Sequence, residues 1–291
     1  MKEVFILKVK ANVQFTLAYI DEQVEWKVKK HIARFTYQLK KYKTGKRFGG
    51  NYIYKINQES ELYKQIINFY DLNRKTVEFI VLNYDVIISE EGLKKAQAYV
   101  LRFPEYYCEE YEDICNEYDE CDACYSKRKG NTIFYAQPKG YIKKHKNDCG
   151  IAALDGTGEL MLLPKLAEEL QKEGIDQKYF QPVLSKSKHI LGYIFVTDNI
   201  LPKGSYMDGN YIVRNQCEKC GRINMTEDEN VFQFQQKYIT QSGIKELKDV
   251  NLTYEFFDGY QEILISRKVA EIIKKNVPDA EFYPVFKELE K

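Results

Sequence analysis

Two Cys-x-x-Cys pairs constrain this chain more than any other feature of its sequence. The first pair is Cys121 and Cys124, and the second is Cys217 and Cys220, which Gly221 follows. Two residues between cysteines let both sulfurs face one ion, and two such turns complete a tetrahedron of thiolates. The spacing therefore predicts a zinc ion bound by these four cysteines. A closed set of four thiolates leaves no position for water, so we expect a structural site rather than a catalytic one.

The separation of the two pairs indicates what the metal would hold together. Cys217 lies 93 positions after Cys124, far more than in a compact zinc ribbon, so the ion is expected to staple an insertion or two subdomains. Its binding would then contribute folding free energy on the order of 10 kcal/mol. The alternative interpretation is four reduced cysteines, one pair of them acting as a redox dithiol. Further candidate ligands are Cys108, Cys115, Cys149 and His145.

Composition is that of a globular protein with a sizeable core. Hydrophobic residues make up 44% and charged residues 30% of the 291 positions, and the net charge of +1 predicts no overall attraction to nucleic acid or membranes. The start of the chain does not match a signal peptide, and no apolar run approaches the roughly 18 residues of a membrane span. We therefore expect a cytoplasmic protein, in which seven cysteines indicate metal rather than disulfides.

Strand and helix patterns predict an α+β fold with antiparallel or mixed sheets. Residues 158–183 and 260–285 each contain an apolar strand, an amphipathic helix and a final Phe-x-Pro-Val, which indicates repeated strand–helix units. A third strand–helix pattern spans residues 77–101. Asp-Gly at 208–209 and at 258–259 predicts two type I′ hairpin turns.

The expected domain division follows a change of composition after Phe103-Pro104. Residues 1–103 would form an N-terminal α/β region that contains a basic segment. Residues 104–291 would form an α+β domain stapled by zinc and containing two strand–helix units.

The basic segment, residues 27–55, holds ten lysines and arginines and no acid, with aromatic residues interleaved. Its cations would bind phosphates and its aromatic rings would stack on bases. The alternative is an amphipathic region whose lysines are only solvated. The candidate nucleic-acid-binding residues are Lys40, Lys41, Lys43, Lys46 and Arg47.

The acidic segment, residues 105–122, holds nine acids and neither lysine nor arginine, with four tyrosines interspersed. Clustered carboxylates steer a basic partner and tyrosines anchor interfaces, so this segment is a candidate docking surface. The alternative is a solvated loop beside a metal-binding turn. The candidate partner-binding residues are Glu105, Glu109, Glu110, Glu112, Asp113, Glu117, Asp119 and Glu120.

No catalytic signature is present in the sequence. The three histidines lie in no H-E-x-x-H or H-x-E pattern, and there is no G-x-S-x-G, P-loop or dinucleotide fingerprint. We therefore expect no enzymatic activity and no catalytic residue.

Taken together, these motifs resemble a known group of proteins. A Cys-x-x-Cys, a unit ending in Phe-x-Pro-Val, a Cys-x-x-Cys-Gly and a second such unit resemble the bacterial double-CXXCG proteins. Residues 263–285 are similar to the C-terminal element of the polymorphic-toxin immunity family numbered eleven. The resemblance covers residues 80–290, and Tyr125 stands where the first pair would carry glycine.

The resemblance implies an immunity protein, which neutralises a cognate toxin in the cytoplasm by binding it. If that toxin is a nuclease with a basic cleft, the acidic segment would be a natural inhibitor surface. The alternative is a zinc-stabilised nucleic-acid-binding protein that uses residues 27–55. Nucleic acid is a partner only in that alternative, and neither interpretation involves a membrane.

Overall fold

The structure is a computed structural model that describes residues 10–19, 25–46, 52–87, 90–102, 108–109, 118–125, 127–129, 134–136, 140–154, 159–228 and 235–288. The chain forms two compact units, which comprise residues 1–94 with 228–235 and residues 95–227 with 236–291. Within the described ranges, no helix has both the length and the apolar character needed to cross a membrane.

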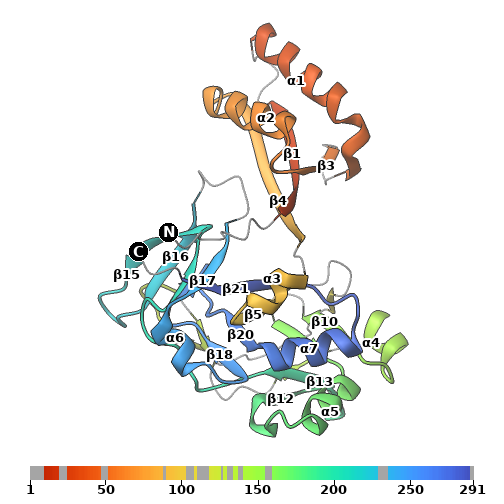
Figure 1. Ribbon diagram of the computed structural model, residues 1–291, viewed down its shortest axis with the longest axis vertical. Coiled ribbons are helices and arrows are strands. Elements are labelled where there is room, and N and C mark those ends of the chain that lie inside the picture. The colour runs from red at the N-terminus through yellow and green to blue at the C-terminus, as the bar shows by residue number, and fades with distance from the viewer. Residues whose placement is uncertain are drawn as a thin grey trace. The chain divides into compact units, whose positions relative to one another are not determined.

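The first unit is a four-stranded antiparallel sheet with two main helices, α1 and α2 (Figure 1). The strand order is β2-β3-β1-β4, and α1 contacts β1 while α2 contacts β4. The elements are β1 (Lys10–Tyr19), α1 (Trp26–Leu39), the 3-10 helix η1 (Lys40–Tyr42), β2 (Lys43–Lys46), β3 (Tyr52–Asn57), α2 (Glu61–Leu72) and β4 (Val77–Ile87), with α3 (Glu90–Lys95) at the boundary.

Apolar residues at helical spacing build the core of this unit. Ile32, Phe35 and Leu39 recur every three or four residues on α1 and are buried. The ring of Phe15 from β1 lies 5.6 Å from that of Tyr63 on α2. This core leaves the opposite side of α1 exposed, and that side carries Lys27, Lys30 and Arg34 of the basic segment.

The second unit contains two six-stranded sheets, a three-stranded sheet and a two-stranded sheet. The six-stranded sheets have the orders β6-β10-β11-β13-β12-β9 and β14-β17-β21-β5-β20-β18, with antiparallel and parallel pairs in both. The predicted α+β fold is therefore confirmed. The elements are β5 (Ala98–Leu101), β6 (Cys108–Glu109), β7 (Tyr118–Glu120), β8 (Lys127–Lys129), β9 (Phe134–Tyr135), α4 (Gly140–His145), β10 (Ile151–Leu154), β11 (Glu159–Leu162), α5 (Pro164–Lys172), η2 (Gln177–Tyr179), β12 (Phe180–Leu184), β13 (Ile190–Phe195), β14 (Tyr206–Asp208), β15 (Tyr211–Gln216), β16 (Ile223–Glu227), β17 (Lys237–Ile239), α6 (Gln241–Glu246), β18 (Val250–Leu252), β19 (Phe256–Phe257), β20 (Ile263–Ser266), α7 (Arg267–Asn276) and β21 (Phe282–Lys287).

The two six-stranded sheets contain the same structural repeat. Residues 134–184 run β9-α4-β10-β11-α5-β12, and residues 237–287 run β17-α6-β18-β20-α7-β21, with β19 as an addition. The strands also pair in the same way in both repeats. In the orders β10-β11-β13-β12-β9 and β18-β20-β5-β21-β17, the first three pairs are antiparallel and the last pair is parallel. The predicted strand–helix units are thus parts of a larger repeat.

The central strand of each repeat comes from a different part of the chain. β13 follows the first repeat directly, whereas β5 precedes the first repeat and inserts between β20 and β21 of the second. Pro182 faces Tyr193 of β13, and Pro284 faces Tyr99 of β5. Gly-Tyr-Ile-Phe of β13 and Ala-Tyr-Val-Leu of β5 therefore occupy equivalent places. Their likeness is the sequence signal that could have identified the central strands.

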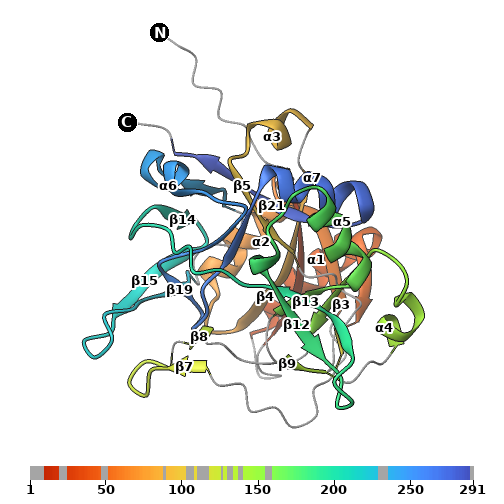
Figure 2. The ribbon, with the colours of Figure 1, turned by 90° about the horizontal axis from the view of Figure 1, so that it is seen from below.

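The main helices of the two repeats, α5 and α7, contact each other (Figure 2). α5 packs on β13 and α7 packs on β5 and β20. Pro164 occupies the first turn of α5, and Ser266 caps α7 by accepting a hydrogen bond from the Val269 backbone N–H at 3.3 Å. A first-turn proline and a serine N-cap are local sequence signals of a helix start, and α5 and α7 begin at them.

The division between the units differs from the expected boundary after residue 103. Residues 98–101 form β5, which is hydrogen-bonded to β20 and β21, so the chain has entered the second unit by residue 95. The helix predicted within residues 77–101 is also shorter than expected. It is α3, which ends at Lys95, because residues 98–101 form β5 instead. The partners of β5 lie more than 150 positions later, and a local pattern does not reveal them.

The two predicted Asp-Gly turns have opposite outcomes. Asp258 and Gly259 have φ of 48° and 89°, and Phe257 and Tyr260 on either side form an antiparallel bridge, which confirms the turn. The prediction at residues 208–209 is wrong, because β14 pairs with β17 and β15 pairs with β16.

Candidate metal centre

Each Cys-x-x-Cys pair lies in the turn of a β-hairpin. Cys121 and Cys124 stand between β7 and β8, and Cys217 and Cys220 stand between β15 and β16. Figure 2 shows β7, β8 and β15 in one region of the second unit. Both turns thus belong to one unit, and the chain between them contains the whole first repeat.

The four sulfur atoms converge on one point. Cys121 Sγ lies 3.8 Å from Cys217 Sγ, Cys124 Sγ lies 3.7 Å from Cys220 Sγ, and all four Sγ atoms lie within 4.8 Å of one another. A disulfide bond would require about 2.05 Å, so these are four separate thiols. Together they form a ligand set that can hold a metal ion.

The backbone of the two turns is equivalent. Tyr125 and Gly221, which follow the second cysteine of each pair, have φ of 57° and 72°. The Tyr125 N–H donates to the Cys121 carbonyl at 2.7 Å, and the Gly221 N–H donates to the Cys217 carbonyl at 2.8 Å. The absence of glycine from the first pair therefore does not alter its geometry, although a tyrosine at positive φ is strained.

Charged groups beside the cysteines link the two turns. Lys219 Nζ lies 2.5 and 2.6 Å from the two carboxylate oxygens of Asp122. The hydrogen bond from Lys219 lowers the pKa of Asp122, and the same bond raises the pKa of Lys219. Desolvation and then hydrogen bonds with the other three thiols raise the pKa of Cys220 to about 12. A thiolate at Cys220 therefore needs a compensating cation, and metal binding would release its proton.

The other candidate ligands do not join this cluster where the structure describes them. His145 Nδ1 lies 3.0 Å from Asp148 Oδ2, and Cys149 Sγ lies 4.0 Å from Asn276 Oδ1. Cys108 begins β6, and its side chain is outside the described part. Cys115 also lies outside the described residues.

The acidic segment is described only at its edges. Glu109 ends β6, and Asp119 and Glu120 lie in β7, where their Cα partners are Arg128 and Lys127 of β8. The remaining candidates of this segment lie outside the described residues and are Glu105, Glu110, Glu112, Asp113 and Glu117.

The candidate nucleic-acid-binding residues cluster after α1. Lys40 and Lys41 form most of η1, and Lys43 and Lys46 are the ends of β2. Arg47 lies outside the described residues. The structure thus brings the four described lysines onto two adjacent elements of the first unit.

A buried charged network in the second unit was missed by the sequence analysis. Lys237 of β17 forms an ion pair with Asp208 of β14 and lies 3.3 Å from Glu262 Oε1, and Tyr206 donates a hydrogen bond to Glu262. Desolvation opposes the charge on Lys237, but the two carboxylates outweigh it and raise the pKa of Lys237. No spacing in the sequence indicates this network, because its members come from three separate segments.

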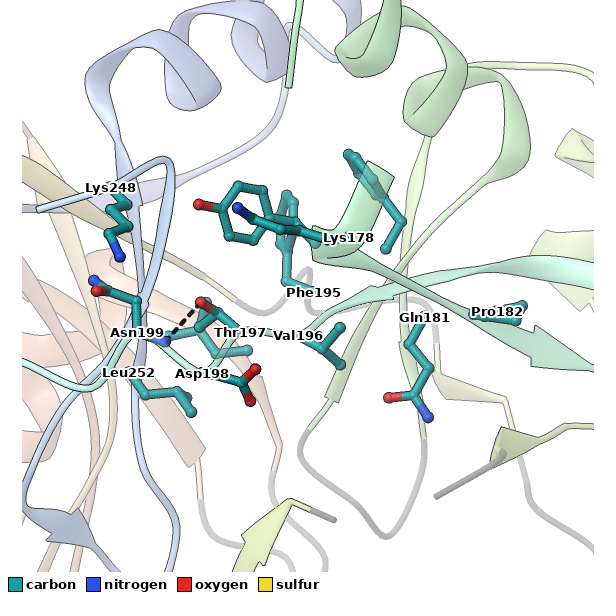
Figure 3. A pocket seen from close by; sticks show the side chains of 13 residues that line it. Lys178, Gln181, Pro182, Phe195, Val196, Thr197, Asp198, Asn199, Lys248 and Leu252 are labelled. Carbon is teal, nitrogen blue, oxygen red and sulfur yellow. Dashed lines mark hydrogen bonds between the residues drawn. The ribbon is translucent and has the colours of Figure 1, made fainter. Parts of the chain in front are cut away.

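The second unit contains a cavity of about 600 Å³. Figure 3 shows the side chains that line it. Its walls come from β12, from residues 195–199 at and after the end of β13, and from Lys248 and Leu252 of the second repeat. Asn199 is held in place, since its side-chain amide donates to Asn251 Oδ1 at 2.7 Å. The cavity lies where the two repeats meet, and its lining residues include no histidine or cysteine.

Comparison of the chain with protein-family models, with curated proteins and with solved structures finds no match. The functional interpretation therefore depends on the residues themselves.

Proposed function

We propose that the four cysteines bind one structural zinc ion. Zinc–sulfur bonds of about 2.3 Å in a tetrahedron place the sulfurs about 3.8 Å apart. The two sulfur–sulfur distances between the turns, 3.8 and 3.7 Å, agree with that value. Four thiolates also match the preference of zinc for soft ligands. This agreement is the observation that carries the proposal.

The zinc joins the β7–β8 hairpin to the β15–β16 hairpin and takes no part in catalysis. Cys121 and Cys217 are buried, and the four thiolates fill a tetrahedral shell, so water has no free position on the ion. Its role is to hold together the two ends of the segment between Cys124 and Cys217, which contains the first repeat.

Purified full-length chain tests the metal directly. Elemental analysis is expected to find one zinc per chain, and removal of the ion by a strong chelator is expected to lower the thermal stability. A chain that folds with equal stability and no metal in chelator would refute the proposal.

In the same proposal, the protein is a non-enzymatic immunity protein that binds and neutralises a cognate toxin in the cytoplasm. Three features support it, namely the closed set of four cysteines, the double Cys-x-x-Cys motif shared with the proteins that it resembles, and the acidic segment, which includes Cys121. A basic cleft of a nuclease toxin would complement that segment, because opposite potentials speed association and fix the register of the complex.

The product of the neighbouring gene, which this proposal expects to be the cognate toxin, tests that function. Co-expression is expected to restore growth of cells that produce the toxin, and reversal of four acids to lysine is expected to weaken binding at low salt, because long-range attraction is then least screened. The four acids are Glu109, Glu110, Glu112 and Asp113.

A matched control reverses four exposed acids elsewhere in the second unit, which are Glu168, Glu246, Glu271 and Asp279. This control is expected to bind the toxin normally. Equal affinity of both variants would exclude the acidic segment as the docking surface, and failure to restore growth would refute the immunity function.

A further inference from the structure

The exposed side of α1 carries large aromatic residues that its own unit does not bury. Trp26 is 71% exposed and Tyr37 is 70% exposed. Eleven residues separate them, so they lie on one stripe of the helix about 16 Å apart, opposite the buried stripe. Trp26 is the single tryptophan of the chain. Aromatic rings of this size at a helix surface are typical of contact sites rather than of a solvated face.

Each of these rings has a lysine placed over it. Lys30 Nζ lies 5.0 Å from the ring centroid of Trp26, and Lys40 Nζ lies 4.9 Å from that of Tyr37. The pattern continues beyond the helix, where Lys41 lies over Tyr42. Lys43 of β2 likewise lies over Tyr52 of β3. Four lysine–ring pairs thus follow one another along the chain, and this row has no acid between residues 27 and 57.

A recess of about 650 Å³ adjoins this row. Its lining includes Tyr37, Gln38, Lys40 and Lys41 at the end of α1 and in η1. The facing wall comes from the start of α2, where Glu61 Oε1 accepts a hydrogen bond from Gln65 at 3.4 Å. The recess thus presents two cations and an exposed aromatic ring beside one carboxylate that already has a partner.

Gln38 adds an unused hydrogen-bond acceptor to this recess. Its Oε1 is buried and has no hydrogen-bond partner among the residues that the structure describes. The terminal torsion of glutamine is broad, so the amide can turn toward a ligand that offers an N–H group. The amino groups of nucleobases are such donors, whereas acidic side chains offer acceptors only.

We infer that this face of the first unit binds single-stranded nucleic acid. The lysines contact phosphates, the rings of Trp26 and Tyr37 stack on unpaired bases, and Gln38 accepts a hydrogen bond from a base in the recess. Stacking needs bases that are free of a complementary strand, which favours a single strand over a duplex. An acidic protein would use the cations but would leave the stacking faces unused.

The single tryptophan provides a direct assay on the full-length, zinc-loaded chain. Oligomers of about 12 nucleotides of thymidylate DNA and of uridylate RNA are expected to quench Trp26 fluorescence, and the two arms distinguish DNA from RNA as the ligand. Four phosphate contacts predict that affinity falls about 50-fold between 50 and 200 mM salt. A duplex of the same length is expected to bind more weakly.

Paired substitutions locate the site. Lys40→Glu with Lys41→Glu is expected to abolish most of the salt-dependent binding, while the matched pair Lys143→Glu with Lys144→Glu, at the end of α4, is expected to leave it unchanged. Tyr37→Ala is expected to weaken binding about tenfold through lost stacking. Tyr125→Ala is its control, because Tyr125 is equally exposed at 69% and lies in the other unit.

Three outcomes would overturn the inference. The first is no binding of the oligomers at 50 mM salt. The second is equal affinity of the unchanged chain and of the Lys40→Glu, Lys41→Glu variant for the oligomers. The third is displacement of the oligomers by a polyglutamate peptide whose own binding is unaffected by Tyr37→Ala. The last outcome would assign the face to an acidic protein instead. None of these measurements depends on the toxin, so the immunity function and this inference can fail separately.

Discussion

The two Cys-x-x-Cys turns have the same backbone conformation and each contribute two cysteines to the cluster, but they differ in the strands that support them. The first is carried by β7 and β8, which have three residues each and, among the described residues, pair with each other. The second is carried by β15 and β16, and β16 also pairs with β19, where Asn224 faces Phe256. Arg222 is buried and its guanidinium lies 5.2 Å from the Phe256 ring.

The same Cys-x-x-Cys motif is therefore carried by two hairpins that differ in stability. A two-stranded hairpin is marginal in water by itself, whereas a third strand and a buried side chain give the second hairpin its own support. We therefore expect the first turn to depend on the metal for its order and the second turn to be largely preformed.

Loss of a ligand is expected to have the largest effect and to be equal for the two turns. Cys121→Ser and Cys217→Ser should each release the metal, because three thiolates bind it far more weakly, and should forfeit stabilisation on the order of 10 kcal/mol. Elemental analysis and thermal unfolding measure both. Cys149→Ser is the matched control, since this thiol lies outside the cluster, and it should retain the metal. Retention of metal in either ligand variant would contradict the assignment.

Removal of the metal is expected to reveal the difference between the hairpins. In chelator, the backbone amides of β7 and β8 should lose most of their protection from hydrogen exchange, while those of β15 and β16 should keep much of theirs. Exchange followed by mass spectrometry measures both hairpins in one sample. Equal loss of protection would show that β19 does not support the second turn.

Gly221→Ala is expected to destabilise the zinc-loaded protein by about 1 kcal/mol. A Cβ at this position meets nothing within 4 Å, so the cost comes from the positive φ alone. Denaturant unfolding measures the change. Gly45→Ala is the control, because a Cβ there makes only an ordinary contact with the Ile53 side chain at 3.8 Å and φ is not positive. An unchanged midpoint for Gly221→Ala would show that this turn adjusts without cost.

Tyr125→Gly is expected to have the opposite sign, a gain of about 0.5 kcal/mol. Glycine relieves the strain of positive φ, and the exposed Tyr125 ring gives up little packing in exchange. Tyr125→Ala keeps the strain and should show no gain in the same denaturant assay. Destabilisation by glycine would mean that the Tyr125 ring contributes more to the stability of the protein than its exposure indicates.

The ion pair between the turns is expected to have the smallest effect. Because the hydrogen bond from Lys219 lowers the pKa of Asp122, its stabilisation is present above the ordinary aspartate pKa and is lost as pH falls through the lowered one. Both side chains are well exposed, so solvent screens the pair and Lys219→Gln should not change the unfolding midpoint. An NMR titration of Asp122 should nevertheless show its pKa returning toward the ordinary value in that variant.

The comparison of the two repeats shows where sequence patterns succeed. The Phe-x-Pro-Val endings and the helices before them were predictable, because a helix face and a cap are local properties of Pro164 or Ser266 and their neighbours. The Asp258-Gly259 turn was predictable for the same reason, since positive φ at both residues is a local preference. At residues 208–209 the same local preference failed, because the flanking strands found partners in different sheets.

By itself, the sequence determined the four candidate cysteine ligands, the α+β class and the positions of the main helices in the repeats. Only the tertiary structure decided that the two Cys-x-x-Cys turns meet, that β5 completes the second repeat, and that Lys237 is buried between Asp208 and Glu262. The physical reason is the range of the interactions. Caps, turns and amphipathic faces are set by residues a few positions apart, whereas strand pairing and metal coordination bring together segments whose separation along the chain carries no local signal.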